Sequence, residues 1–213
     1  MSMPRVDVLI TTIGRPSLEQ AVLAGLRQSY ADCRVVIISD GECARARQAT
    51  LAMSNASIHE PPVLYTETPK RFGAGNLAKH WWINSGQASP WIRTCDDDDW
   101  IPPDSVKHMM AQVQDDTVLV MAPTMTLQNF AGRPVKYRVT RGVLVPDQCG
   151  FGSALFNTEA AQGIPLPHAK AADCKFLQAI AAKGHVGRVN APMYWYNGYR
   201  TDASRGYGQG AAT

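Results

Sequence analysis

The sequence predicts an α/β protein in which helices flank a mostly parallel central sheet. Four short apolar segments in the first half of the chain alternate with segments of helical periodicity, and this alternation is typical of parallel sheets with right-handed crossovers. The apolar segments also begin about 28 residues apart, which is roughly the length of one βαβ unit. Their first residues are Val6, Arg34, Pro62 and Trp91.

The elements of the first half follow from apolar runs and helix-start signals. We expect strands at residues 6–10, 35–38, 63–66 and 91–95. The first helix is predicted to begin near Ser17, because Ser17 and Gln20 have the spacing of a capping box. Apolar residues then recur at helical spacing at Leu18, Val22 and Leu26. Two more helices are expected at residues 44–53 and 77–84.

The second half predicts fewer crossovers and a small antiparallel addition to the sheet. A helix over residues 106–113 follows Pro102 and Pro103, in agreement with the preference of proline for the first turn. We expect strands at residues 117–126, 150–156, 186–189 and 193–196, and a small hairpin from 134–139 and 142–145. An amphipathic helix over residues 173–183 ends at Gly184.

Composition excludes several classes of protein. The 213 residues are 45% hydrophobic, enough for one domain with a sizeable core. No apolar run is long enough to span a membrane, and the first residues lack the apolar stretch of a signal peptide, so we expect a soluble, cytoplasmic protein. The five cysteines are odd in number and form no C-x-x-C pair, which argues against a disulfide framework or a zinc site. The net charge of +3 permits a phosphate-bearing partner.

Four consecutive carboxylates, Asp96 to Asp99, follow the fourth predicted strand. Side by side they repel one another, which raises the pKa of at least one unless a positive charge lies nearby. A hard divalent cation, Mg²⁺ or Mn²⁺, accepts carboxylate oxygens and leaves coordination sites open for substrate phosphates. The alternative interpretation is a solvated acidic turn before a helix.

Polar residues also follow the other predicted strands, and this favours a binding site over a chance acidic turn. In an open parallel sheet, ligands bind beyond the carboxyl ends of the strands. The residues that follow the four strands there are Thr11, Thr12, Gly14 and Arg15; Ser39, Asp40 and Gly41; Thr66 and Glu67; and Asp96 to Asp99.

With these motifs in this order, the chain resembles the family 2 glycosyltransferases of the Rossmann-like GT-A fold. The Asp96–Asp99 run with Trp100 and Pro103 resembles the D-x-D-D segment of that family. Residues 172–177, followed by Gly184 and residues 193–196, resemble its E-D-x-x-L helix and closing strand. The resemblance divides a single domain of residues 1–213 into a nucleotide-sugar-binding half (1–103), an acceptor-side half (104–200) and a tail (201–213), either flexible or ordered as a lid.

The resemblance implies a metal-dependent donor site. Asp98 and Asp96 are the expected ligands of Mn²⁺ or Mg²⁺, with Asp96 or Asp97 also in contact with the ribose; Asp99 is either part of the site or a cap at the start of the next helix. The resemblance assigns Asp40 to the nucleobase, uracil by preference, although an Asp-Gly turn is the plain alternative. The family has Arg-Asn where this chain has Gly75-Asn76, so the diphosphate is expected to contact Arg71 or Lys79 instead. The remaining donor-binding residues implied by the family are Thr11, Thr12, Gly14, Arg15 and Asn76.

The resemblance also assigns a catalytic base, Asp173, to an inverting transfer from a UDP-sugar to an acceptor hydroxyl. A plain alternative for Asp173 is a carboxylate favoured at a helix N-terminus. Gly150, Phe151 and His168 are candidates for the acceptor side. The acceptor partner is a glycan, a lipid-linked glycan or a modified base in DNA.

Two other classes remain as alternatives to a glycan-forming transferase. One is a DNA-modifying glycosyltransferase that acts on a hydroxylated base, for which binding to DNA would depend on salt. The other is a nucleotidyltransferase-like protein that binds nucleotide-sugars, but the segment from Thr11 to Arg15 is too short and too poor in glycine for a nucleotidyltransferase phosphate loop. No P-loop and no G-x-G-x-x-G motif follows a strand.

Overall fold

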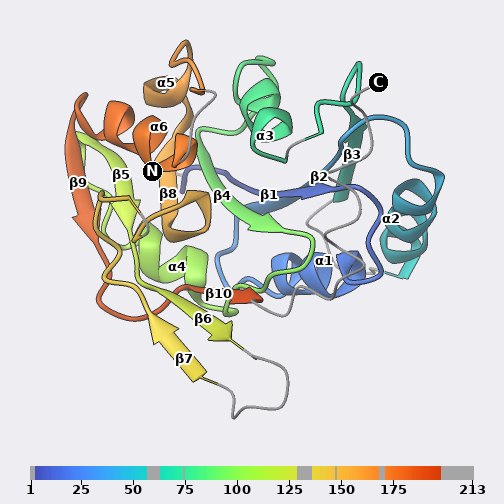
Figure 1. Ribbon diagram of the computed structural model, residues 1–213, viewed down its shortest axis with the longest axis horizontal. Helices are drawn as coiled ribbons and strands as arrows, with labels where there is room; N and C mark the ends of the chain where they lie inside the picture. The colour runs from blue at the N-terminus through green and yellow to red at the C-terminus, as the bar shows by residue number, and fades with distance from the viewer. Residues whose placement is uncertain are drawn as a thin grey trace.

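A mostly parallel sheet forms the centre of the computed structural model, which describes residues 3–56, 63–73, 75–128, 136–146, 148–167 and 171–197. Seven strands of this described part form the sheet, in the order β3-β2-β1-β4-β8-β5-β9 (Figure 1). They are β1 (Val6–Thr12), β2 (Cys33–Ser39), β3 (Val63–Glu67), β4 (Trp91–Asp96), β5 (Thr117–Met121), β8 (Ala154–Asn157) and β9 (His185–Arg188). The first four strands are parallel to one another, as the sequence predicts.

Strand β8 is the exception to the parallel arrangement, because it runs antiparallel to both of its neighbours, β4 and β5. Its direction brings the residues that precede it, rather than those that follow it, to the carboxyl ends of the parallel strands. A short 3₁₀ turn, η1 (Phe151–Ser153), stands at that edge. The strand predicted for residues 150–156 is therefore correct only from Ala154 onward.

Helices pack on both faces of the sheet (Figure 1). One face packs against α1 (Leu18–Leu26), α2 (Ala44–Ala56) and α4 (Ser105–Met110) through a core that includes Val8, Ile10 and Val22. The opposite face packs against α3 (Gly75–Ile83), α5 (Thr158–Ala161) and α6 (Ala172–Ala181). Buried side chains of that face include Leu9, Trp82 and Phe176. The alternation of successive β1 side chains between the two cores follows from the pleat of a strand.

A small second sheet lies beside the first and has the strand order β10-β6-β7. Strand β6 (Thr124–Gln128) pairs parallel with β10 (Tyr194–Asn197) and antiparallel with β7 (Lys136–Val139). A bridge between Trp100 and Trp195 ties this sheet to the segment that follows β4. The small acceptor-side addition is thus present, but it contains a parallel pair as well as an antiparallel one.

Three local predictions were wrong. The strand expected over residues 117–126 is divided between the two sheets, since Pro123 has no N–H to continue the first ladder. The predicted hairpin of 134–139 with 142–145 is wrong: β7, which covers residues 136–139 of it, pairs with β6, and Gly142, with φ of 59°, leaves the strand region of the backbone. Ser17 precedes α1 without a side-chain cap, since its own φ and ψ of −73° and −11° are helical rather than extended.

The other predicted helices agree with the structure to within a few residues, and α5 was not predicted. Its N-cap is Asn157, whose side chain accepts a hydrogen bond from the backbone N–H of Ala160. No helix in the described residues has the length and apolar character needed to cross a membrane. The predicted tail, residues 201–213, lies outside the described part of the chain.

Candidate functional site

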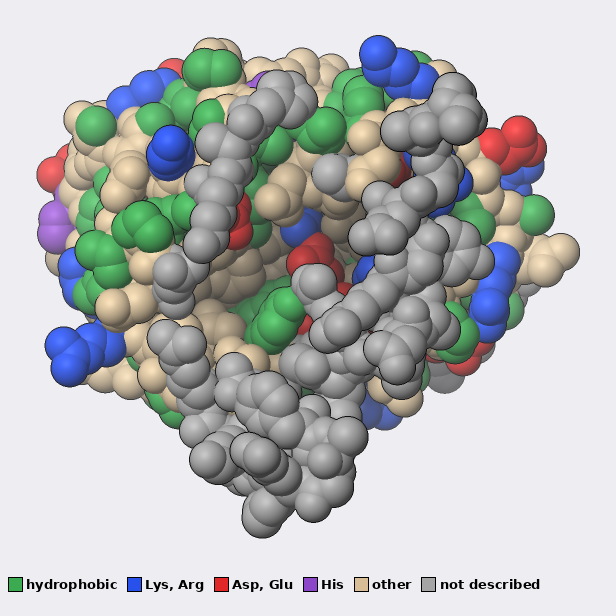
Figure 2. All heavy atoms as spheres, in the orientation of Figure 1, with side chains coloured by type: hydrophobic (Ala, Val, Ile, Leu, Met, Phe, Trp, Pro, Cys, Tyr) green, Lys and Arg blue, Asp and Glu red, His purple; other side chains and the backbone are tan. Residues whose placement is uncertain are grey.

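The carboxyl ends of β1 and β4 meet at the edge where the sequence places its polar motifs. Thr11 pairs with Asp96 in the register of these two strands. A cavity of about 450 Å³ opens at this edge, and Figure 2 shows the hollow near the middle of the face, with acidic side chains at its floor. Six of the predicted site residues line it: Asn76, Lys79, Asp96, Gly150, Phe151 and Asp173.

Asp96 has a cation beside it. The Nζ atom of Lys79 on α3 lies 2.5 Å from Oδ1 of Asp96, and the Thr11 hydroxyl donates to the same oxygen at 3.3 Å. The Lys79 side chain is 2% exposed and that of Asp96 is 40% exposed. Burial by itself would raise the pKa of Asp96, but the charge and hydrogen bond of Lys79 outweigh it and lower the pKa below the ordinary value. Asp96 is therefore an ionised carboxylate at the rim of the cavity.

Asp97 is held by the segment that follows β1. Its carboxylate accepts from the Thr12 hydroxyl at 2.6 Å, the Ile13 N–H at 3.4 Å and the Arg15 guanidinium at 2.6 Å. The residue is buried, with 1% exposure. These contacts hold Asp97 against the segment that follows β1. Both carboxylate oxygens of Asp97 accept hydrogen bonds within the protein.

Asp98 is the more exposed neighbour, with 26% of its side chain accessible and the Arg15 guanidinium 3.3 Å away. Burial raises the pKa of the Asp98 carboxyl, and the negative charges of Asp97 and Asp96 raise it further against the effect of Arg15. A raised pKa, which the sequence predicts for at least one carboxylate of the acidic run, is thus found at Asp98.

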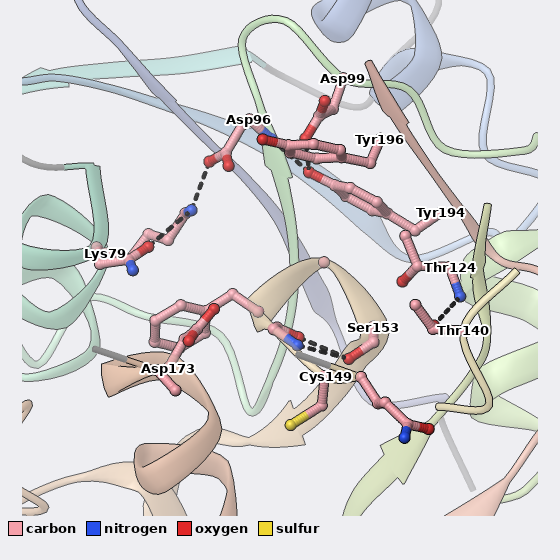
Figure 3. Close-up of a pocket in the computed structure, with 16 residues that line it drawn as sticks. Lys79, Asp96, Asp99, Thr124, Thr140, Cys149, Ser153, Asp173, Tyr194 and Tyr196 are labelled. Carbon is pink, nitrogen blue, oxygen red and sulfur yellow. Dashed lines mark hydrogen bonds and ion pairs between the residues drawn. The ribbon is translucent and has the colours of Figure 1, made fainter. Parts of the chain in front are cut away.

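Asp99 does not cap the next helix. The residue in the cap position of α4 is Asp104, whereas Asp99 is buried and accepts a hydrogen bond from the Tyr194 hydroxyl on β10. That same hydroxyl accepts a hydrogen bond from the backbone N–H of Asp96 at 3.2 Å. Tyr194 therefore joins the two ends of the acidic run, as Figure 3 shows.

The donor set of this edge fits a hard divalent cation. Asp96 and Asp98 are both partly exposed, and the second carries a raised pKa that a nearby cation would relieve. Mg²⁺ in proteins is commonly held by one or two carboxylates together with substrate phosphates. Within the described residues, no three His, Cys, Asp or Glu side chains are grouped closely enough to hold a metal by themselves.

Asp40 lies beside a second cavity, of about 510 Å³, rather than in the first. Its two carboxylate oxygens accept from the backbone N–H groups of Phe72 and Gly73, at 2.6 and 2.8 Å. Arg71 and Glu67 line the same cavity. The close approach of Arg71 to Gly41, which has φ of 82°, explains the glycine after Asp40.

Asp173 reaches the first cavity from the start of α6. Its Oδ1 atom accepts from the N–H of Cys174 at 2.9 Å, and a Cβ atom on Gly150 would lie 2.8 Å from Oδ2. Ala171, the residue before α6, has φ of 59° and ψ of 35°, the left-handed conformation that is costly for a residue with a side chain. This strained residue directs the chain into α6 and brings Asp173 to the cavity wall (Figure 3).

Of the acceptor-side candidates, Gly150 and Phe151 line the cavity and His168 lies outside the described residues. The ring of Phe151 packs against Phe156 and Phe176, with centroid separations of 6.1 and 5.4 Å. The ammonium group of Lys79 lies 5.5 Å from the centroid of the Phe151 ring. Phe151 therefore packs against the Lys79 ammonium as well as lining the cavity.

Several cavity residues were not predicted. They come from the small sheet, from the residue that follows β7 and from η1: Thr124, Thr140, Ser153, Tyr194 and Tyr196. The one local signal was the alternation in Tyr194-Trp195-Tyr196, which places the two tyrosines on the same face of a strand. Their position opposite the acidic run depends on contacts across the whole chain.

Arg93 supports this side of the cavity from inside the protein. Its guanidinium donates to neutral oxygens rather than to a carboxylate: the carbonyls of Gly152, Ala154 and Met193 and the Ser105 hydroxyl. Burial lowers the pKa of Arg93 to about 10, with partial compensation from Tyr194 and Cys95. Arg93 thus links β4, β8 and the segment before β10.

The comparison with protein families gives one match, over residues 7–159, to the family described as Glycosyl transferase family 2. No curated protein sequence matches the chain. Solved structures of glycosyltransferases do match it in fold, at low sequence identity.

One such structure is TarS of S. aureus, with a TM-score of 0.70, 12% identity, and coverage of 91% of this chain and 36% of that chain. Residues 1–349 of TarS in complex with UDP-GlcNAc give a TM-score of 0.69 at 12% identity, over 98% of this chain and 62% of that one. The mannosyltransferase PcManGT from Pyrobaculum calidifontis, in complex with GDP-Man and Mn²⁺, gives 0.67 at 14% identity, over 92% and 57%. The chain spans less than two thirds of each of these proteins. The predicted GT-A fold is confirmed.

Proposed function

The chain belongs to glycosyl transferase family 2, and we propose on this basis that it transfers a sugar from a nucleotide diphosphate to an acceptor hydroxyl. One observation carries the proposal. Asp96, at the end of β4, and Asp173, at the start of α6, line the same cavity although they lie 77 residues apart in the sequence. The proposed transfer needs groups that bind the donor and a base for the acceptor, and these two carboxylates are the candidates for the two sides.

On the donor side, the cavity beside Asp40 and Arg71 is proposed to receive the nucleobase and ribose. The diphosphate then lies near Lys79, Arg15 and the Asp96–Asp98 segment. Asp96 and Asp98 would hold the divalent cation, which supplies Lewis-acid stabilisation to the departing phosphate. The Lys79 ammonium adds a fixed positive charge at the same edge, where it stabilises charge that develops as the C–O bond breaks.

On the acceptor side, Asp173 is proposed to take the proton of the attacking hydroxyl. A single displacement with inversion needs this base on the face of the sugar ring opposite the leaving phosphate. The support is geometric: Asp173 comes from α6 and Asp96 from β4, on different sides of the cavity (Figure 3). The hydrogen bond from the Cys174 N–H to Oδ1 of Asp173, at 2.9 Å, holds the carboxylate at the start of α6.

We propose a UDP-sugar as the donor. The support is indirect, since TarS structures of this fold contain UDP and UDP-GlcNAc, whereas PcManGT contains GDP-Man. The nucleotide is therefore the first property to test.

The test is a thermal-shift and calorimetric series with UDP, GDP, UDP-sugars and GDP-Man, each with Mn²⁺, Mg²⁺ or EDTA. A ligand that binds only the native state raises the melting temperature in proportion to its affinity. We expect UDP and UDP-sugars with Mn²⁺ to give the largest rise, and slow release of UDP from the matching UDP-sugar without acceptor. No stabilisation by any nucleotide in the presence of either metal would overturn the proposal.

A further inference from the structure

Two thiols lie against each other at the wall of the cavity that holds Asp173. The Sγ atoms of Cys149 and Cys174 are 2.6 Å apart, although the residues are separated by 25 positions in the sequence. A disulfide bond is about 2.05 Å long, so these sulfurs lie within about 0.6 Å of bonding distance. The fold has therefore brought the sulfur atoms of two distant cysteines close to bonding distance.

The pair is placed around the proposed catalytic base. Cys174 follows Asp173 directly and is fully buried in the first turn of α6. Cys149 precedes Gly150, is partly exposed, and lines the cavity. Gly150, which follows Cys149, closely approaches the carboxylate of Asp173, which precedes Cys174: a Cβ added to Gly150 would lie 2.8 Å from Oδ2.

The remaining cysteines have different surroundings. The thiol of Cys43 faces the carbonyl oxygen of Ile13 at 3.7 Å, and that of Cys95 faces the carbonyl oxygen of Asp96 at 3.5 Å. Cys33 is buried at the start of β2. The thiols of Cys43 and Cys95 thus face carbonyl oxygens, whereas those of Cys149 and Cys174 face each other at the cavity wall.

We propose that Cys149 and Cys174 form a reversible disulfide that fixes Asp173 against the Gly150 segment. The effect on catalysis rests on the proposed function, whereas the bond itself does not. The oxidant is a small-molecule disulfide such as oxidised glutathione. The exposed Cys149 sulfur attacks it and releases one small thiol, and Cys174 then displaces the second. The two protein thiols lose two electrons and two protons, and the small disulfide gains them as two thiols.

The reaction is expected to be slow. Burial and the neighbouring Cys174 thiol raise the pKa of Cys149, so only a small fraction is present as the attacking thiolate. Exchange should accordingly be followed over hours rather than seconds.

The first experiment detects the bond without any assay of transfer. The full chain is incubated with oxidised glutathione or with dithiothreitol, then alkylated, digested and examined by mass spectrometry, with thiols counted after unfolding. We expect the oxidised protein to contain a peptide that joins Cys149 to Cys174 and to lose two of its five thiols. Five free thiols, a glutathione adduct alone, or a different cysteine pair would overturn the proposal.

Variants separate this bond from general oxidation. Cys149→Ser and Cys174→Ala should each abolish the cross-link, and Cys43→Ser should retain it. The oxidised parent should melt about 5 °C or more above its reduced form, because the bond restrains the unfolded chain. Neither Cys149→Ser nor Cys174→Ala should show this rise, and a rise in both would count against the assignment.

The second experiment tests the positioning of Asp173. With the UDP-sugar identified, we expect oxidation to leave the Kd for UDP unchanged and to raise kcat several-fold, as a base held in place is more often aligned with the acceptor. The same treatment should not change kcat in Cys149→Ser. A cross-link with unchanged kcat would exclude the positioning role. If the protein transfers no sugar, the first experiment still shows whether Cys149 and Cys174 form a disulfide.

Discussion

The ammonium nitrogen of Lys79 lies 2.5 Å from Oδ1 of Asp96. This contact joins α3 to the end of β4 and puts a buried cation at the first carboxylate of the acidic run. The chain itself therefore supplies positive charge at the place where the phosphates of a donor are expected to bind.

Replacement of Lys79 by methionine should weaken the binding of UDP. The variant keeps most of the side-chain volume over Phe151 but leaves the Asp96 charge uncompensated near the diphosphate. A hydrogen bond to a charged group is worth about 1.5–3 kcal/mol, so we expect a Kd about 10- to 100-fold higher by calorimetry. The exposed Lys175 on α6 offers the matched control, Lys175→Met, for which the Kd should not change. Equal affinities of parent and Lys79→Met would contradict a role of Lys79 in phosphate binding.

Replacement of Asp173 by asparagine should separate binding from transfer. Asparagine keeps the shape of the side chain but cannot take the proton of the attacking hydroxyl. General-base assistance is worth about 10²- to 10⁴-fold in rate. We expect kcat to fall by that factor while the Kd for UDP stays the same. Transfer at the parental rate would place the base elsewhere.

The Tyr194 hydroxyl should contribute to both stability and the donor site. It donates to buried Asp99 and accepts from the Asp96 N–H, so Tyr194→Phe leaves a buried carboxylate with one partner fewer. Such a loss costs about 1–3 kcal/mol, measured as a lower free energy of unfolding in urea. Tyr30→Phe, which removes a hydrogen bond to the Pro4 carbonyl far from the cavity, is the control. It should lower stability without affecting UDP affinity, whereas Tyr194→Phe should lower both.

Two glycines at the cavity wall predict different responses to the same substitution. A Cβ at Gly152 would lie 2.5–2.7 Å from three ring atoms of Tyr194, and a Cβ at Gly150 would approach only the tip of the Asp173 side chain. Gly152→Ala should therefore destabilise the fold, by about 1–3 kcal/mol for an overpacked core. Gly150→Ala should mainly reduce kcat, as the Asp173 carboxylate rotates away. Urea unfolding and steady-state kinetics of both variants test the distinction, and identical behaviour would refute it.

Arg93 should be irreplaceable by lysine. Its guanidinium reaches four oxygens on three parts of the chain, and a lysine ammonium with three hydrogens at one point cannot satisfy them all. Leaving buried acceptors unpaired costs about 1–3 kcal/mol each, so we expect Arg93→Lys to lower the free energy of unfolding by about 3 kcal/mol or more. Arg5→Lys, at an exposed ion pair with Asp32, should have almost no effect.

The fold of the first half could be predicted because each strand and helix is encoded locally. Apolar runs of four or five residues, each followed by helical spacing, predict β1 to β4 and their parallel direction. The second half could not be read in this way. The run 117–126 is mostly apolar, and the missing N–H of Pro123 divides it between two sheets. Nothing in Ala154–Asn157 indicates that the strand is antiparallel, since direction depends on its partners.

The candidate site was predictable to the same extent. Asp96 and Asp173 could be proposed because each belongs to a motif at the end or start of an element, and Lys79 was one of two candidates, with Arg71, to replace the Arg-Asn that the family has where this chain has Gly75-Asn76. Tyr194 was missed because its contact with Asp96 spans 98 positions, and no local pattern encodes such a contact. The role of Arg93 could not be read from the sequence, because three of its four partners are backbone carbonyls, which carry no signature in the sequence.

The reversed direction of β8 has a consequence for how this scaffold can diversify. Segments that leave the parallel strands build the proposed donor site, whereas the proposed acceptor wall is built by a segment that enters the sheet. The two proposed sides therefore come from opposite ends of their strands. In this proposal, lengthening or exchanging the connection that leads into η1 would change the acceptor side and leave the residues of the donor side in place.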